Sequence, residues 1–148
     1  MTALNHPQIL SRMTSNDRIR LVGEVTTLLL ASNLHVKYLV SDIKSEFLTP
    51  IDYNQFRIYK VGKDPVALVT WAYLTPSIEP KFIRGEYSLR ADDWVGGDRL
   101  WIIDFMAPFG HATRVSQDLR TNVFPNDSAK AIRVDVNGQL KRVYKLHG

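Results

Sequence analysis

An aspartate inside an otherwise apolar run is the residue of this sequence that most needs a chemical explanation. Asp104 lies within residues 100–106, and every other residue of that run is hydrophobic. Burying a carboxylate there costs free energy unless a partner or hydrogen bonds stabilise it. One interpretation is structural, with Asp104 accepting backbone hydrogen bonds at a strand end; the other is an orienting or proton-holding carboxylate in a pocket. Strand alternation would place Asp104 on one face with Ile102 and Met106.

Four histidines are candidates for proton exchange near neutral pH. His6 lies in the expected N-terminal arm and His147 in the last two residues, so both are expected to be incidental. His111 lies at the expected start of a helix, where capping explains it as well as chemistry does. His35 lies at the junction of two expected helices, and such a junction can direct a side chain into a cleft. A surface or capping role is the alternative for His35.

Several chemistries are excluded by what the sequence lacks. The chain has no cysteine, so it has no disulfide, no thiolate metal site and no cysteine nucleophile. It contains no HExxH pattern and no histidine pair at helical ligand spacing, and we expect no bound metal. The GxSxG, P-loop and GxGxxG patterns are absent as well.

The first third of the chain is predicted to be helical. Apolar residues recur at helical spacing between residues 19 and 29, after the N-cap candidates Ser15 and Asn16. A second amphipathic segment follows, and Pro50 is expected to end it. The apolar face of this segment consists of Val36, Leu39, Ile43 and Phe47.

Strand patterns dominate the remainder of the chain. Residues 55–61 and 66–74 are rich in aromatic and β-branched residues and flank a turn, which predicts an antiparallel hairpin. Residues 76–94 are expected to be irregular or partly helical. Residues 99–106 predict a central strand, residues 112–123 a helix, and residues 131–146 a hairpin around Asn137 and Gly138. This order predicts an α/β (α+β) fold with a mixed, mostly antiparallel sheet flanked by helices.

Length and charge set broad limits. A chain of 148 residues with 45% hydrophobic residues predicts one globular domain, with residues 1–15 as a flexible arm and residues 16–148 as the domain. The net charge of +4 permits an acidic partner without identifying it. No apolar run approaches the ~20 residues of a membrane span, and the N-terminus has no signal-peptide pattern. A cytoplasmic protein is expected.

Three segments together resemble one known family. Residues 97–110, Gly-Asp-Arg-Leu-Trp-Ile-Ile-Asp-Phe-Met-Ala-Pro-Phe-Gly, strongly resemble the signature of the RTX toxin-activating lysine acyltransferases, the hemolysin-activating family. Residues 131–135, Ala-Ile-Arg-Val-Asp, resemble a second family segment behind Phe124 and Pro125. Residues 21–35 match a third segment without a gap, and the resemblance runs from about residue 20 to residue 148.

The resemblance implies a specific activity. Members transfer a fatty acyl group from acyl carrier protein to internal lysines of an RTX protoxin in the bacterial cytoplasm, and their fold is similar to that of the GCN5-related N-acetyltransferases. The family's catalytic histidine falls on His35 and its catalytic aspartate on Asp104. A family asparagine associated with the site falls on Glu46, and the tryptophan after the aspartate is Phe105 here. Acyl carrier protein is the expected donor, with no resident cofactor, no nucleic-acid partner and a homodimer as one possible assembly.

His35 is expected to be the general base, oriented by Asp104, or alternatively a nucleophile that carries the acyl group. Arg99 and Arg133 are candidate contacts to phosphopantetheine or carrier protein, with structural salt bridges as an equal alternative. Glu46 is a further candidate for donor or substrate binding. Three other functions remain open: a GCN5-like acetyltransferase using acetyl-CoA, a homologue acting on a non-toxin protein, and a non-catalytic basic binding module. The even spread of basic residues disfavours the binding module.

Overall fold

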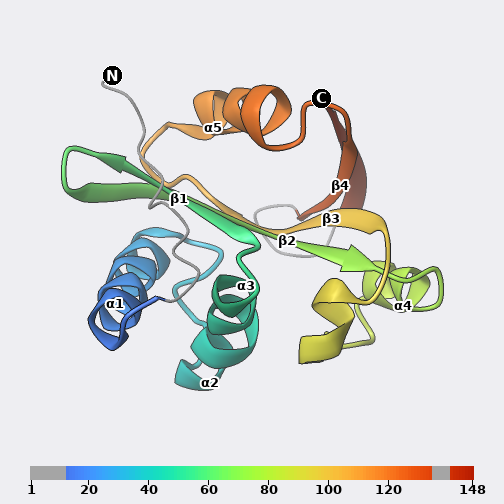
Figure 1. The fold of residues 1–148 in the computed structure, drawn as a ribbon, viewed down its shortest axis with the longest axis horizontal. Helices are drawn as coiled ribbons and strands as arrows, with labels where there is room; N and C mark the ends of the chain where they lie inside the picture. Colours follow the sequence, from blue (N-terminus) through green and yellow to red (C-terminus); the bar gives the residue numbers. More distant parts are fainter. Residues whose placement is uncertain (1–12, 135–140) are drawn as a thin grey trace.

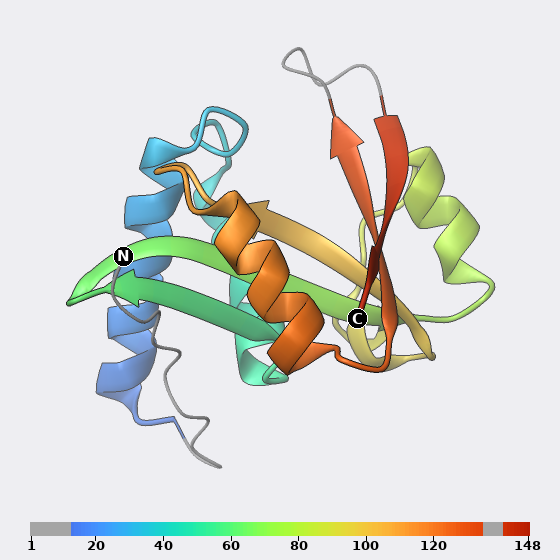
Figure 2. The same ribbon diagram turned by 90° about the horizontal axis from the view of Figure 1, so that it is seen from above.

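A five-stranded sheet with helices on both faces organises residues 13–134 and 141–148, the part of the chain that the computed structural model describes (Figures 1 and 2). The strand order is β1-β2-β3-β4-β5, so β3 is central, as predicted. Only β3 and β4 pair in parallel among the described strands; the other neighbours are antiparallel. The strands are β1 (Phe56–Val61), β2 (Asp64–Leu74), β3 (Arg99–Met106), β4 (Ser128–Val134) and β5 (Lys141–His147).

The helices lie in two layers. In Figure 1, α1, α2 and α3 lie below the sheet and α5 lies above it. The lower layer contains α1 (Ser15–Ala31), α2 (Val40–Asp42), a π-helical turn (Ile43–Leu48) and α3 (Thr49–Asp52). α4 (Ile78–Arg84) and a 3-10 turn (Ala91–Val95) follow β2, and α5 (Ala112–Asp118) continues into a second π-helical turn (Leu119–Val123). This mixed α/β architecture confirms the predicted fold class and is consistent with a GCN5-related fold.

Both faces of the sheet are packed with apolar side chains. Below the sheet, Leu28 of α1 and Met106 of β3 belong to one buried cluster. Above it, Val115 of α5 packs in a different cluster with Trp71 and Ile102. Because each face is covered, β2 and β3 are apolar and buried along most of their length.

The first helix begins one residue earlier than the N-cap candidates implied. Thr14 is the N-cap, and its hydroxyl accepts a hydrogen bond from the backbone N–H of Asp17 at 3.1 Å. The Asp17 carboxylate accepts in return from the backbone N–H of Thr14 at 3.3 Å. This reciprocal capping box satisfies two backbone donors that the helix itself cannot pair.

The second helical segment differs from the prediction in where it starts, where it ends and which of its apolar side chains are buried. Residues 33–37 form turns, and helix begins only at Val40. Pro50 does not end the helical segment, because a π-helical turn leads directly into α3. At the end of this turn, Thr49 N–H donates to the Lys44 carbonyl. A proline at the start of a helical segment has no intrahelical N–H to lose. Phe47 is buried as predicted, whereas Val36 and Leu39 are exposed.

The face of Asp104 is a second correction. Thr70 pairs with Asp104 but Trp71 pairs with Ile102, so Ile103 is an extra residue in β3, a β-bulge. The bulge interrupts the alternation of side chains. Ile102 therefore packs above the sheet in the α5 cluster, while Met106 packs below it in the α1 cluster. Asp104 and Met106 do not share a face with Ile102.

The C-terminal pair of strands agrees with the predicted hairpin. β4 and β5 are antiparallel, with a continuous register from Ser128–His147 to Val134–Lys141. The expected turn at Asn137 and Gly138 and the arm residue His6 lie outside the described residues. The flexible arm over residues 1–15 stays a prediction.

Candidate active site

His35 and Asp104, 69 residues apart in the chain, meet beneath the central strand. His35 Nε2 lies 2.9 Å from Asp104 Oδ1. Both residues are buried, with exposed fractions of 7% and 5%. The burial removes competing water, so the imidazole and the carboxylate interact strongly. The structure thus brings together the two residues that the sequence singled out.

The turn after α1 fixes the position of His35. The carbonyl of Ser32 accepts hydrogen bonds from the backbone N–H groups of His35 and Val36, at 3.0 and 2.9 Å. The His35 carbonyl accepts from Tyr38 N–H at 2.9 Å. These bonds hold the backbone in consecutive turns. The His35 side chain is directed inward, while its neighbours Leu34 and Val36 are exposed.

The β-bulge in β3 fixes the position of Asp104. Its backbone N–H donates to the hydroxyl of fully buried Thr70 at 3.1 Å. One carboxylate oxygen, Oδ1, is engaged by His35. The other, Oδ2, is buried, and the Tyr38 hydroxyl lies close enough to this carboxylate for a hydrogen bond that contributes to the raised pKa of Tyr38. A β-bulge can change the face to which a side chain points. Here it places the Asp104 carboxylate against the His35 imidazole.

Ser32 completes a chain of three polar side chains. Its hydroxyl oxygen lies 2.6 Å from His35 Nδ1. An ionised carboxylate only accepts hydrogen bonds, so Nε2 of neutral His35 carries the proton toward Asp104 and Nδ1 accepts the Ser32 hydroxyl hydrogen. Ser32 is only partly buried, so its hydroxyl connects the buried imidazole with the surface. Ser32 precedes His35 by three residues, about one helical turn, and this spacing is the one signal of the contact in the sequence.

The charge of Asp104 acts on two further side chains, Glu46 and Tyr38. Burial raises the pKa of Glu46 to about 7, and the charges of Asp104 and Asp42 act in the same direction. Burial, followed by the carboxylates of Asp104 and Glu46, raises the pKa of Tyr38 well above its usual range. The Tyr38 ring lies 5.1 Å from the His35 ring, centroid to centroid. The structure therefore places Glu46 near the His35–Asp104 pair.

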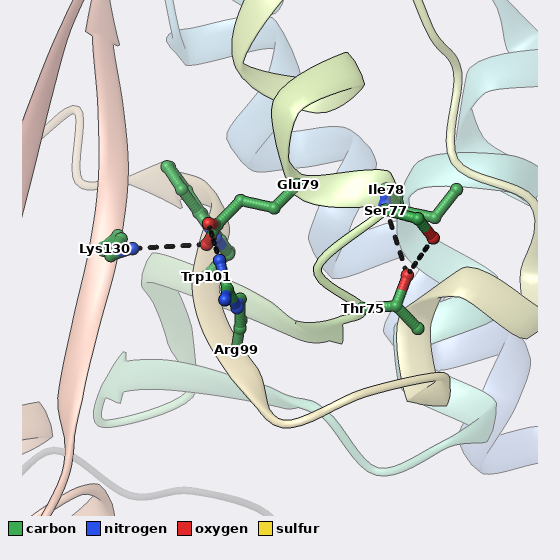
Figure 3. A network of polar contacts seen from close by, with 7 residues as sticks. All are labelled: Thr75, Ser77, Ile78, Glu79, Arg99, Trp101 and Lys130. Carbon is green, nitrogen blue, oxygen red and sulfur yellow. Dashed lines mark hydrogen bonds and ion pairs between the residues drawn. The ribbon is translucent and has the colours of Figure 1, made fainter.

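Arg99, in contrast, is engaged elsewhere. Its guanidinium donates to Glu79 Oε1 at 2.6 Å, and Trp101 Nε1 and Lys130 Nζ approach Oε2 at 2.7 and 3.3 Å (Figure 3). Arg99 precedes Asp104 by five residues of strand, or about 17 Å. Of the two roles proposed for Arg99, the structure shows the salt bridge.

Glu79 is a buried acid that the sequence analysis missed. Burial alone would raise the pKa of Glu79, but the hydrogen bonds from Trp101, Arg99 and Lys130 outweigh it and the pKa is lowered. Next to Glu79, the Thr75 hydroxyl accepts from Ile78 N–H at 3.2 Å at the start of α4 (Figure 3). This network ties α4 to β3 and β4. Glu79 lies in a segment of the sequence without clear periodicity, so the sequence does not indicate that this glutamate is buried and hydrogen-bonded.

The remaining candidates lie away from the pair. Arg133 is exposed, and its guanidinium lies over the Tyr144 ring at 5.4 Å. His111 is the N-cap residue of α5, but its side chain makes no capping hydrogen bond. His147 Nδ1 lies 3.3 Å from the Ser128 hydroxyl. Within residues 13–134 and 141–148, no group of three metal-ligating side chains is found, and no helix is long and apolar enough to cross a membrane.

Comparison with known proteins assigns the chain to a family. The model of the RTX toxin acyltransferase family matches residues 14–147. The RTX-I toxin-activating lysine-acyltransferase ApxIC of Actinobacillus pleuropneumoniae is 39% identical over 127 residues, covering 86% of this chain and 73% of the relative. The protein-lysine myristoyltransferase HlyC of Escherichia coli is 35% identical over 136 residues, covering 92% and 79%. An uncharacterized protein of Synechocystis is 34% identical over 127 residues, covering 84% and 86%. The chain therefore belongs to the RTX toxin acyltransferase family, and the protein is an acyltransferase enzyme.

Proposed function

We propose that the enzyme transfers a fatty acyl group from acyl carrier protein to the ε-amino group of internal lysines of an RTX protoxin, in the cytoplasm, and thereby activates the toxin. The observation that carries the proposal is the hydrogen-bonded chain of Ser32, His35 and Asp104, with its imidazole and carboxylate buried, in a member of this family. Relatives named as a toxin-activating lysine-acyltransferase and a protein-lysine myristoyltransferase support the lysine acceptor and the long acyl group.

The acceptor must lose a proton to react. A free lysine has a pKa near ~10.4, so about one in a few thousand is neutral at pH 7. As the amine nitrogen bonds to the thioester carbonyl carbon, its proton moves to the Ser32 oxygen and the Ser32 proton moves to His35 Nδ1. The carbon–sulfur bond then breaks, and the imidazolium returns the proton to the departing thiolate. A positioned histidine base contributes roughly 10²–10⁴-fold.

Asp104 stabilises this cycle through charge. Its carboxylate accepts from His35 Nε2–H, which fixes the tautomer and leaves the Nδ1 lone pair toward Ser32. When Nδ1 gains a proton, the imidazolium forms beside a buried negative charge. The pair is then an ion pair rather than an isolated buried cation, which would be costly.

The alternative mechanism makes His35 a nucleophile. Nε2 is held by Asp104, so the acyl group would have to form its bond with Nδ1, after the Ser32 hydroxyl turns away. Rapid quench of enzyme with donor but no acceptor distinguishes the two mechanisms. An acylated His35 supports the nucleophile, and its consistent absence supports the base.

The arrangement of β3 and β4 supports a phosphopantetheine donor. In the described part of the chain these parallel strands pair only at Trp101–Lys130 and Ile102–Ala131, and Figure 2 shows them diverging beyond. Among the described residues, β3 therefore has no strand partner on its β4 side beyond Ile102, in the stretch that contains Asp104. The amide groups of a pantetheine arm can hydrogen-bond to an unpaired strand edge. The net charge of +4 suits docking of an acidic carrier protein.

The test compares donors and acceptors directly. The enzyme is incubated with tetradecanoyl acyl carrier protein or acetyl-CoA and an unmodified RTX protoxin, and modified lysines are mapped by mass spectrometry. We expect tetradecanoyl-lysine with wild type and none with folded His35→Ala. The apparent affinity for the carrier protein should fall as salt increases, because charges at the rim are screened. Equal use of acetyl-CoA with salt-independent binding would refute the carrier-protein donor.

A further inference from the structure

The second oxygen of the Asp104 carboxylate needs a hydrogen-bond donor. The contact with His35 Nε2 uses Oδ1, at 2.9 Å. Oδ2 is buried as well, so water does not supply a donor to it. A buried acceptor that stays unpaired costs free energy, and an ionised one costs more. A carboxylate that is held through one oxygen can also rotate about its Cβ–Cγ bond. A donor to Oδ2 would both pair this oxygen and keep Oδ1 directed at the imidazole.

Tyr38 lies where such a donor is needed. Its backbone N–H donates to the His35 carbonyl at 2.9 Å, in the same turns that direct His35 inward. Its ring lies 5.1 Å from the His35 ring and 6.1 Å from the ring of fully buried Phe47, centroid to centroid. These contacts hold the phenol beside the imidazole. The hydroxyl lies within hydrogen-bonding reach of the Asp104 carboxylate, which the same imidazole binds.

Glu46 is the other acid whose proton lies near Asp104, and it suits this role less well. Burial raises the pKa of Glu46 to about 7, so above neutral pH this side chain is ionised and can only accept hydrogen bonds. The pKa of Tyr38 is raised well above its usual range, because of burial and the nearby carboxylates, so the phenol keeps its proton. Of the two, only Tyr38 remains a donor on both sides of neutral pH.

We infer that Tyr38 is a positioning residue that donates its hydroxyl hydrogen to Asp104 Oδ2 and thereby keeps Oδ1 directed at His35 Nε2. This inference rests on the proposed function, because it assigns Tyr38 a part in the same proton transfer. Tyr38 exchanges no proton itself and acts through Asp104. Hydrogen bonds at catalytic groups are often poorly aligned in a free enzyme and tighten in the complex with substrate. The contribution of Tyr38 therefore belongs to turnover rather than to substrate affinity.

The first measurement compares the kinetics of Tyr38→Phe and Tyr53→Phe with those of wild type. Both tyrosines are 38% exposed, so the control removes the same hydroxyl from a residue of equal exposure, at the end of α3. We expect Tyr38→Phe to lower kcat by about 10–100-fold, the range for losing one hydrogen bond to a charged group. The KM values for donor and acceptor should change little. Tyr53→Phe should keep the wild-type kcat and KM.

The second measurement reports the His35 tautomer without any substrate. Each variant is labelled with ¹⁵N-histidine, and the ring-nitrogen shifts are recorded at pH 8. These shifts differ according to which nitrogen carries the hydrogen, and the loss of signals in His35→Ala assigns them. We expect wild type and Tyr53→Phe to hold the hydrogen on Nε2, as the contact with Asp104 requires. Tyr38→Phe should move toward a mixture of the two tautomers, with the unfolding midpoint unchanged.

Any of three results would overturn the inference: a wild-type kcat in Tyr38→Phe, unchanged His35 shifts in that variant, or equal changes in Tyr53→Phe. A raised KM with kcat retained would also overturn it, because the hydroxyl would then serve substrate binding. The two measurements separate this inference from the proposed function. If wild type acylates lysine and the His35 shifts do not respond to Tyr38→Phe, only the role of Tyr38 is refuted. If wild type acylates no lysine, the proposed function fails, and the shifts still show whether Tyr38 orients the His35–Asp104 pair.

Discussion

Glu46→Gln should stabilise the protein at alkaline pH and leave it unchanged at acid pH. Burial raises the pKa of Glu46 from its ordinary value of 4.5 to about 7, with help from the charges of Asp104 and Asp42. Glutamine has the size of a protonated glutamic acid but cannot ionise. The substitution therefore removes an unfavourable buried charge only under conditions in which Glu46 carries one.

The sign follows from proton binding in the two states. Below pH 4.5, Glu46 is protonated in both the folded and the unfolded chain, so its ionisation contributes no penalty. Between pH 4.5 and about 7 the folded state keeps a proton that the unfolded state has released, so the stability falls as pH rises through this window. At about 1.4 kcal/mol per pH unit, the loss reaches at most about 3 kcal/mol above pH 7, and residual solvent contact reduces it.

The assay is urea unfolding at pH 4.5 and pH 8 for wild type, Glu46→Gln and Glu86→Gln. Glu86 is an exposed glutamate that pairs with Arg84 at 3.3 Å, so its removal should change stability little at either pH. We expect Glu46→Gln to exceed wild type by about 1–3 kcal/mol at pH 8 and to match it near pH 4.5. A constant difference across pH, or a variant less stable at pH 8, would refute the electrostatic reasoning.

Asp104→Asn should keep the shape of the site but remove the charge that fixes the His35 tautomer, and turnover should fall by about 10⁴-fold with little change in melting temperature; a less stable but fully active variant would remove Asp104 from the mechanism. Ser32→Ala should lower turnover by at most roughly 10²–10⁴-fold while donor affinity is kept, because only the proton path to Nδ1 is lost; single-turnover kinetics measure this, and an unchanged rate excludes the relay. Glu79→Gln should lower the free energy of unfolding by about 1–3 kcal/mol, because it weakens the ties to Arg99 and Lys130, and chemical denaturation should show this with turnover retained in the folded protein.

Much of the fold could be predicted because its signals are local. The central strand β3 is a continuous apolar run, and its bounds agree with those predicted from the sequence. The hairpin of β1 and β2 follows from two strand-like runs around a turn in which Gly62 has a positive φ of 62°. These features depend on neighbouring residues alone. The predicted start of the second helix was wrong because the backbone hydrogen bonds of residues 33–37 determine where the helix begins. Hydrophobic periodicity carries no information about these bonds.

The site could be predicted in its residues but not in its geometry. Asp104 stands out by composition, but its face depends on a bulge that only the pairing of β2 with β3 reveals. Ser32 has an ordinary residue type at an ordinary helix end, and only the fold turns its hydroxyl toward His35. Glu79 is similar: the donors that surround it come from β3 and β4, up to 51 residues away.

The error at Val36 and Leu39 has a physical cause that bears on function. Amphipathic periodicity reports only that apolar side chains share a face, and it does not distinguish a face that packs in the core from one that stays exposed. Because Val36 and Leu39 are 47% and 67% exposed, each loses only part of the roughly 1.5–3 kcal/mol that full burial contributes. A fold accepts such a loss more readily where local turns serve another purpose. Here the turns that expose Val36 and Leu39 are the ones that direct His35 inward, so one stretch of backbone accounts for both features.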